Sequence, residues 1–295
     1  YWNHTNSINP PGVSNLFIGM TSSYYFREPI VWYSLRIIYR LFDSEFLAFF
    51  LLDLVSFIFL FKAISLQKYV LTYSKDVKYL YFVIFLFFPF MLGFHFIYRQ
   101  YIATIFLLYA IGCVGNKNLW LCFIFFLCSV LSHNAAVLFL PLLLYLSNLR
   151  LSKPLAVISL SLVPLAFYYM ELIENLTNLS SKSNINIGGG IGWYYFVLFT
   201  LILFLILILR MIKKSANDSI LIFFGILFSW ISFWAAVILE TSVSERLGFM
   251  MLALMYPLLL IYLDYKLSIN FLTRILIIII TVFIPFSYYS NPISF

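Results

Sequence analysis

The stretch VLSHNAAVLFLPLLLY, residues 130–145, carries a histidine in an otherwise apolar run. A histidine can take up or release a proton near neutral pH, so His133 is a candidate for acid–base chemistry. Ala135 and Ala136 beside it are small enough to let another group approach. Two interpretations stay open: His133 is an idle residue at a helix end, or it faces an aqueous cavity and handles a proton there.

Two arginines begin apolar runs elsewhere, Arg99 in YRQYIATIFLLYAIG and Arg246 in SERLGFMMLALMY. A planar guanidinium binds phosphate or carboxylate through two parallel hydrogen bonds, a geometry that lysine lacks. His95 lies four residues before Arg99 and shares its face if the helix is continuous. Each arginine alone is explained equally well as an anchor at the membrane–water interface, and Arg246 also as a salt-bridge partner.

A third polar group lies in YYFREPIVWYSLRIIYR. Arg27 and Glu28 come directly before a predicted amphipathic helix over Pro29–Phe42, which has its proline in the first turn. Arg36 and Arg40 are four residues apart and share one face of that helix. For Glu28, the favourable position of an acid at the positive end of a helix dipole is a sufficient structural explanation.

The elements that must position these residues are membrane helices. The chain has 295 residues, of which 64% are hydrophobic and 10% charged. Apolar stretches of about 20 residues predict an all-α, polytopic integral membrane helix bundle. A single transmembrane domain over 1–295 is expected, in which 1–45 forms an outer loop and the amphipathic helix, and 46–295 forms the bundle with an outer loop at 172–191. Ten spans are predicted, at 46–64, 78–97, 99–115, 118–132, 134–149, 154–171, 192–212, 218–239, 247–264 and 271–289.

Alternation of these spans divides the eighteen basic residues unequally between two sides. Twelve fall on one side, and nine of these are lysines; six fall on the other side, and five of these are arginines. The positive-inside rule predicts that the lysine-rich side is cytoplasmic. The arginines then lie on the outer side, where they are suited to grip an anion. The outer basic residues are Arg27, Arg36, Arg40, Arg99, Lys182 and Arg246.

Neither a metal ion nor a cofactor is expected. His4, His95 and His133 lie far apart in the sequence, and no cluster of aspartates accompanies them. The glycine-rich NIGGGIGW in the outer loop is interpreted as flexible, because it lacks the Lys-Ser/Thr pair of a phosphate-binding loop. The net charge of +7 is explained as an orientation signal, and no nucleic-acid partner is expected.

Three regions, namely REPIVWYSLRIIYRLF, YRQYIATIFLLYAIG with LSHNAAVLFLPLLLY, and SERLGFMMLALMY, resemble the EpsG-like group of bacterial polysaccharide polymerases, relatives of the Wzy O-antigen polymerases. The shared features are an acidic–proline pair at an early outer helix, an arginine before a helix of small residues, a histidine followed by a small residue, and a late arginine before an aromatic-containing helix. The resemblance covers residues 24 to 260, approximately. Members of the group usually begin with a membrane helix and an aspartate-containing outer segment, so this part is expected to be missing or different here, where the sequence starts at Tyr1.

The resemblance implies a metal-independent membrane glycosyltransferase of the bacterial inner membrane, with its active site on the periplasmic side. It would join oligosaccharide repeat units carried on undecaprenyl pyrophosphate into O-antigen, capsule or exopolysaccharide. Its partners would be the lipid-linked oligosaccharide, membrane lipid and a chain-length regulator. His133 and Glu245 are then the candidate catalytic residues. The candidate ligands of pyrophosphate or substrate are Arg27, Glu28, Arg36, Arg40, His95, Arg99 and Arg246.

Two other functions stay open, a flippase for lipid-linked oligosaccharides and a membrane acyltransferase that modifies surface glycan. A flippase should carry cations deep in the membrane along its whole path, whereas the predicted spans are nearly free of charge at mid-depth, with Asp53 as the main exception. An acyltransferase would also use a histidine, but its usual His-Asp or paired-histidine signatures are not visible. The one-sided distribution of charge therefore favours the polymerase.

Overall fold

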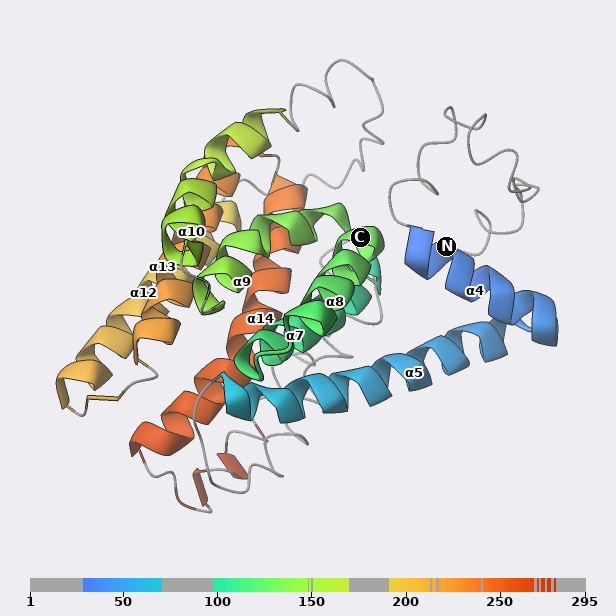
Figure 1. Cartoon of the computed structure of the whole chain (residues 1–295), viewed down its shortest axis with the longest axis horizontal. Coiled ribbons are helices and arrows are strands. Elements are labelled where there is room, and N and C mark those ends of the chain that lie inside the picture. Colours follow the sequence, from blue (N-terminus) through green and yellow to red (C-terminus); the bar gives the residue numbers. More distant parts are fainter. Residues whose placement is uncertain are drawn as a thin grey trace.

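A computed structural model describes residues 29–70, 98–147, 149, 151–169, 191–212, 214–215, 218–239, 241–267, 270, 272–273, 275–276 and 279. Every regular element in these residues is helical, as the sequence predicted (Figure 1). Within them, four helices are long and apolar enough to cross a membrane, and the number rises to five if two helices that meet at a bend of 42° form one span. The protein is a multi-pass membrane protein. Ten spans are not confirmed, because 78–97 lies outside the described residues and 271–289 lies almost entirely outside them.

The predicted amphipathic helix is confirmed with its predicted bounds, and three of the predicted spans are short helices of 18 residues or fewer. A further helix, Val163–Tyr169, follows α10 across the bend. The elements in chain order are α4 (Pro29–Phe42), α5 (Glu45–Leu66), the 3-10 helix η1 (Gln67–Tyr69), α7 (Tyr98–Gly115), α8 (Leu119–Ser132), the 3-10 helix η3 (Asn134–Phe139), α9 (Leu140–Leu146), α10 (Ser152–Ser161), α12 (Ile191–Ile212), α13 (Asp218–Ile238) and α14 (Thr241–Leu267).

Helix α7 lies in the middle of the bundle and is buried along nearly its whole length, which fits a helix that is apolar all round. It packs against α5, α8 and α14, and also against η3 and α9. Phe59 of α5 contacts Phe106 and Tyr109 of α7, and further along both helices Leu66 lies against Gly112. Helices α5 and α7 therefore run parallel, as the alternation of predicted spans requires.

Helices α7 and α8 form an antiparallel hairpin with a tight turn. Lys117 in the turn has a φ of 59°, a left-handed conformation that costs a non-glycine residue roughly 1–2 kcal/mol. The side chain of Asn118 then caps α8 by accepting a hydrogen bond from the Leu121 amide. Near the other end of the hairpin, the Ser129 hydroxyl donates to the Ala103 carbonyl at 2.7 Å, so the two helices are joined by a buried polar bond as well as by apolar packing.

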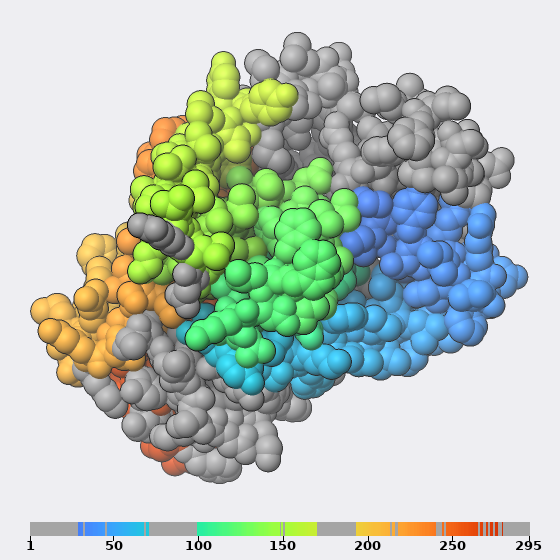
Figure 2. All heavy atoms as spheres, in the orientation of Figure 1, coloured from blue at the N-terminus to red at the C-terminus, as the bar shows by residue number. Residues whose placement is uncertain are grey.

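Helices α12, α13 and α14 form the second half of the bundle, with α9 and α10 against α13 (Figure 2). Gly248 of α14 lies so close to the ring of Tyr195 on α12 that a Cβ atom at this position would collide with it. The indole Nε1 of Trp230 on α13 donates to the Leu160 carbonyl of α10 at 3.0 Å. In Figure 2, α8 and α9 lie between α4 on one side of the molecule and α10 and α12 on the other.

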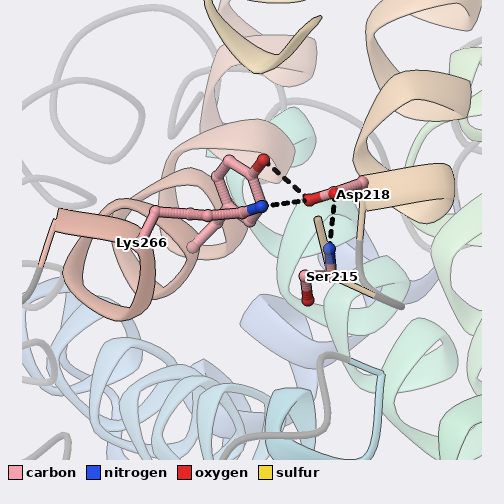
Figure 3. Close-up of polar contacts among 4 residues, drawn as sticks. Ser215, Asp218 and Lys266 are labelled. Carbon is pink, nitrogen blue, oxygen red and sulfur yellow. Dashed lines mark hydrogen bonds and ion pairs between the residues drawn. The ribbon is translucent and has the colours of Figure 1, made fainter. Parts of the chain in front are cut away.

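The start of α13 and the end of α14 are joined by a buried ion pair (Figure 3). Lys266 Nζ lies 2.9 Å from Asp218 Oδ1, and the two side chains are only 1% and 2% exposed. The Tyr262 hydroxyl donates to the same oxygen at 2.8 Å, and the Ser215 amide donates to Asp218 Oδ2 at 2.7 Å. The carboxylate is thus surrounded by donors, which is what a buried charge requires.

This ion pair marks one end of the bundle, and other contacts place the helices relative to it. The Tyr145 hydroxyl near the end of α9 reaches the Ser219 carbonyl at 3.4 Å, so α9 ends at the ion-pair end. Because η3 and α9 together span roughly 20 Å, they begin toward the opposite end. Helix α14, whose last turn contains Lys266, also begins at that opposite end. We refer to it as the histidine end, because His133 immediately precedes η3.

Candidate active site

His133 lies at a break between two helices. Its backbone is extended, with φ −159° and ψ 122°, so it ends α8 and begins η3. Its amide donates to the Ser129 carbonyl at 2.9 Å, and its carbonyl accepts from the Ala136 amide at 3.0 Å, so the backbone is fixed from both directions. Pro141 downstream has no N–H and cannot extend an α-helical ladder back toward the break. The side chain of His133 is therefore held at a defined point, half-buried, where two short helices meet.

A hydrogen bond joins this break to the first turn of α7. The Nε2 atoms of Gln100 and His133 lie 2.7 Å apart. Gln100 is buried, and its backbone carbonyl accepts from the Thr104 hydroxyl at 2.7 Å. Arg99 directly precedes Gln100 and is half-buried. Arg99 is thus next in the chain to the residue that contacts His133.

Arg246 lies at the same end of the molecule. It belongs to the second turn of α14, which begins at the histidine end and packs against α7. The Arg246 side chain is half-buried, and the nearby Ser244 is buried with a hydroxyl that has no hydrogen-bond partner within the described part of the chain. Two helix N-termini, each with an arginine in its first two turns, therefore lie at one end, and both the helix dipoles and the guanidinium groups favour an anion there.

An acidic residue lies near this group as well. Asp53 of α5 is half-buried, and its charge acts on the hydroxyl of Tyr101, the residue that follows Gln100. Tyr101 itself is almost fully buried. The intramembrane charge that the sequence showed in the first span therefore interacts electrostatically with the residue that follows Gln100 in the chain.

The other predicted site residues divide into two groups. Helix α4 packs against α5 and α8, and of its two arginines Arg36 is half-buried and Arg40 is exposed. The remaining predictions fall outside the description, which leaves out Arg27, Glu28, His95, the side chain of Glu245 and nearly all of the loop 172–191.

Gln100 is the site residue to which the sequence analysis gave no role. The hairpin offered a usable signal, because Gln100 and His133 are equally far from its turn. Gln100 precedes Asn116 by the same number of residues as His133 follows Lys117. In an antiparallel helical hairpin, residues equally far from the turn lie at the same level. Arg99 was predicted from its charge and His133 from its acid–base chemistry, whereas the amide of Gln100 has neither property.

The arrangement provides an imidazole, a buried amide that holds it, and two arginines at one end of the bundle. In the described part of the chain, no group of three or more His, Cys, Asp or Glu side chains lies close enough together to hold a metal ion. Such a site can bind an anionic group and orient a hydroxyl next to it.

The EpsG family model matches residues 15–295, which extends beyond the region of the three motifs. No curated protein and no solved structure matches the chain. The family match agrees with the resemblance drawn from the motifs around Arg99, His133 and Arg246. The chain belongs to the EpsG family, a family of Wzy-like polymerases.

Proposed function

We propose that the protein polymerises oligosaccharide repeat units carried on undecaprenyl pyrophosphate, at the outer face of the bacterial inner membrane. Family membership supports a polymerase of the Wzy type in general. The lipid carrier and the outer face are part of the proposal, and they rest on the chemistry of the site and on the lysine bias of the opposite side. The product is a surface polysaccharide.

The reaction forms one glycosidic bond and breaks one bond to phosphate. A hydroxyl of the acceptor unit attacks the anomeric carbon of the donor chain, the lipid pyrophosphate leaves with the bonding electron pair, and the hydroxyl proton passes to His133 or to the leaving pyrophosphate. Arg99 and Arg246 bind the pyrophosphate and stabilise the charge that develops on it. His133 either takes the proton or orients the hydroxyl.

One observation carries this proposal: the hydrogen bond between Gln100 and His133 brings the histidine to the first turn of α7, beside Arg99. A group that interacts with a hydroxyl and a group that binds pyrophosphate thereby lie at the same end of the bundle. This is the combination that a lipid-linked sugar transfer requires, since nucleophile and leaving group must be handled together.

The distribution of charge also distinguishes a polymerase from a flippase. In the described helices, the ionised clusters lie at the two ends, with Arg99 and Arg246 at the histidine end and the paired Lys266 and Asp218 at the other. The buried ion pair is fully engaged with donors and offers no site for a moving phosphate. A translocation path would need accessible cations between the two ends.

The test is a gene deletion complemented with the wild-type chain or with His133→Ala at equal protein levels, followed by gel analysis of surface glycan. The polymerase predicts surface glycan with single repeat units in the deletion strain and in the variant, and long chains with the wild type. Complete loss of surface repeat units in the deletion strain would contradict the proposal and indicate a flippase instead. Full-length but unmodified glycan would indicate an acyltransferase.

A further inference from the structure

The contact between Gln100 and His133 has only one chemically allowed direction when the ring is neutral. Both contacting atoms are nitrogens, 2.7 Å apart. The amide nitrogen of glutamine carries two hydrogens and does not accept, so it must be the donor. Nε2 of the imidazole must then be the acceptor and cannot carry a proton. Gln100 is only 5% exposed, so bulk water does not compete for this bond.

The direction of the bond determines the tautomer of the ring. A neutral imidazole has one protonated nitrogen and one accepting nitrogen. With Nε2 accepting from Gln100, the proton is on Nδ1. The ring nitrogen through which His133 meets any other group is therefore a hydrogen-bond donor, because the identity of the protonated nitrogen is set by the bond that the other nitrogen makes.

The opposite orientation of the amide is less favourable. In the observed orientation, the atom that lacks a hydrogen-bond partner among the described residues is Oε1 of Gln100, an acceptor. Rotation of the amide by a half-turn would direct Oε1 at the ring and would bury the NH2 group in that same place. Buried N–H groups without a partner are rarer in proteins than under-satisfied carbonyl oxygens. The observed orientation is therefore the more favourable one, because it leaves a carbonyl oxygen without a partner instead of an NH2 group.

We propose that Gln100 is a positioning residue that holds His133 in its Nδ1–H tautomer, so that His133 serves as a hydrogen-bond donor to an oxygen of the substrate. The inference deepens the proposed function, on which it rests, by choosing between the two roles of His133. Orientation of a substrate oxygen is assigned to the histidine, and removal of the hydroxyl proton is not. A protonated ring could not keep this bond, because both nitrogens would then be donors.

The tautomer can be measured directly by nitrogen-15 NMR of the full chain labelled at histidine. The chain has three histidines, and the His133→Gln variant identifies the signals of His133 by their loss. The expected result for the wild type is a protonated Nδ1 and an unprotonated Nε2. A protonated Nε2 in the wild type would overturn the proposal.

Two substitutions at Gln100 test whether this residue determines the tautomer of His133. Gln100→Glu replaces the donor with a carboxylate that only accepts, so the proton should move to Nε2. Gln100→Leu removes the bond with little change in volume, so both tautomers should appear. If the His133 signals in Gln100→Leu match those of the wild type, Gln100 does not set the tautomer.

Gln67 of η1, which also bonds to helix α7, provides a matched control. It is also a fully buried glutamine, and its Nε2 donates at 2.8 Å to the Ala63 and Leu108 carbonyls instead of to a side chain. Gln67→Leu should leave the tautomer of His133 unchanged. A change in the His133 signals of this variant, equal to that in Gln100→Leu, would show that general loosening of the bundle is responsible and would contradict the proposal.

A double-mutant cycle separates positioning from a general structural effect on turnover. Gln100→Leu should lower polymerisation about tenfold or more in the wild type and have no further effect when His133 is already alanine, because Gln100 acts through His133. Equal losses in both backgrounds would contradict the proposal. The NMR result needs no substrate, so an Nδ1–H tautomer in a protein that makes no polymer would remove the proposed function alone. Active protein with an Nε2–H tautomer would remove only this inference.

Discussion

At the scale of the residue, the chemistry of the site depends on how His133 is held. Its backbone is bonded on both sides of a helix break, and one ring nitrogen is occupied by Gln100. A side chain fixed at three points loses little freedom when a substrate arrives, which favours precise orientation. The choice of a neutral partner matters, because a carboxylate in place of Gln100 would favour a protonated Nε2.

The His133 variants should therefore differ from each other. His133→Ala should lower polymerisation roughly 10²–10³-fold, the usual effect of removing one oriented donor. His133→Gln retains an N–H donor and should stay within about tenfold of the wild type. The measurement is chain length and rate of polymer formation at equal amounts of membrane-inserted protein. If His133→Gln is as inactive as His133→Ala, proton transfer at the ring is the function that was lost.

The arginines should not tolerate lysine. Arg99→Lys and Arg246→Lys keep the charge but lose the second parallel hydrogen bond to phosphate. Loss of a charge-assisted hydrogen bond costs about 1.5–3 kcal/mol, so turnover should fall about 10- to 100-fold in each variant. Arg40→Lys, at an exposed residue of α4, serves as the comparison and should have a smaller effect. Wild-type chain length in both Arg99→Lys and Arg246→Lys would exclude the bidentate contact.

Residue type alone was enough to predict roles for Arg99, His133 and Arg246, but not for the neutral Gln100. Arg99, His133 and Arg246 stand out because a charge or an imidazole in an apolar run is costly and needs a reason. The role of Gln100 depends on a contact across the α7–α8 hairpin, and Tyr101 with Asp53 depends on the packing of α5 on α7. Such contacts are set by the level at which helices cross, which residue type alone does not reveal.

At the scale of the element, a buried ion pair joins α13 to α14 in the second half of the bundle. Lys266 was predicted only as one of the basic residues that orient the chain, and the structure buries it against Asp218. Its role includes holding the end of α14 on the start of α13. Since α14 is long and carries Arg246 at its other end, this connection helps to fix the helix on which the arginine sits.

Removal of one partner of the pair should therefore be costly. Lys266→Met leaves a buried carboxylate without its counter-charge and should destabilise the protein by about 3–5 kcal/mol. Adding Asp218→Asn should recover most of the loss, because asparagine carries no charge, its oxygen can accept from the Ser215 amide, and the Tyr262 hydroxyl can turn to accept from its NH2 group. Thermal unfolding in detergent measures both.

Lys214→Met is the control for this pair, because Lys214 lies close by in the sequence and is exposed. It should leave the unfolding temperature nearly unchanged. If Lys266→Met were equally harmless, the ion pair would contribute nothing to stability, and its role in fixing α14 would be wrong.

The sequence predicted the elements better than their lengths. The periodicity and the proline placed Pro29–Phe42 correctly, and the apolar runs placed α12, α13 and α14 to within a few residues, except that α14 begins at Thr241 and not near 247. The extra turns of α14 include the polar residues TSVSER, which a hydropathy argument assigns to a loop. Directly after these turns, Gly248 of α14 packs against Tyr195 of α12.

At the scale of the whole molecule, the directions of the described helices agree with the alternation predicted from the basic residues. Helices α5 and α7 are parallel, α7 and α8 are antiparallel, and α13 and α14 are antiparallel. Which end faces the cytoplasm follows from the lysine bias alone. This part of the topology stays a prediction.

Cysteine labelling with an impermeant reagent tests the orientation, in a background without Cys113, Cys122 and Cys128. Lys117 and Asn134 are both exposed and lie near opposite ends of α8. Asn134→Cys should be labelled in intact cells, whereas Lys117→Cys should be labelled only after the inner membrane is opened. Lys182→Cys should behave like Asn134→Cys. The reverse pattern would place the histidine end in the cytoplasm and would contradict an extracytoplasmic active site.

The short helices around His133 have a consequence for the lipid that surrounds them. Helix α8 has 14 residues and α7 has 18. At a rise of 1.5 Å per residue their lengths are about 21 and 27 Å, less than the roughly 30 Å of a typical hydrocarbon core. A bilayer adapts to such hydrophobic mismatch by thinning, which would bring the headgroup of a carrier lipid closer to the site. In vesicles of defined acyl-chain length, polymerisation should be fastest with shorter chains and slow as the bilayer thickens; a rate that does not depend on bilayer thickness would show that the neighbouring long helices set the local bilayer instead.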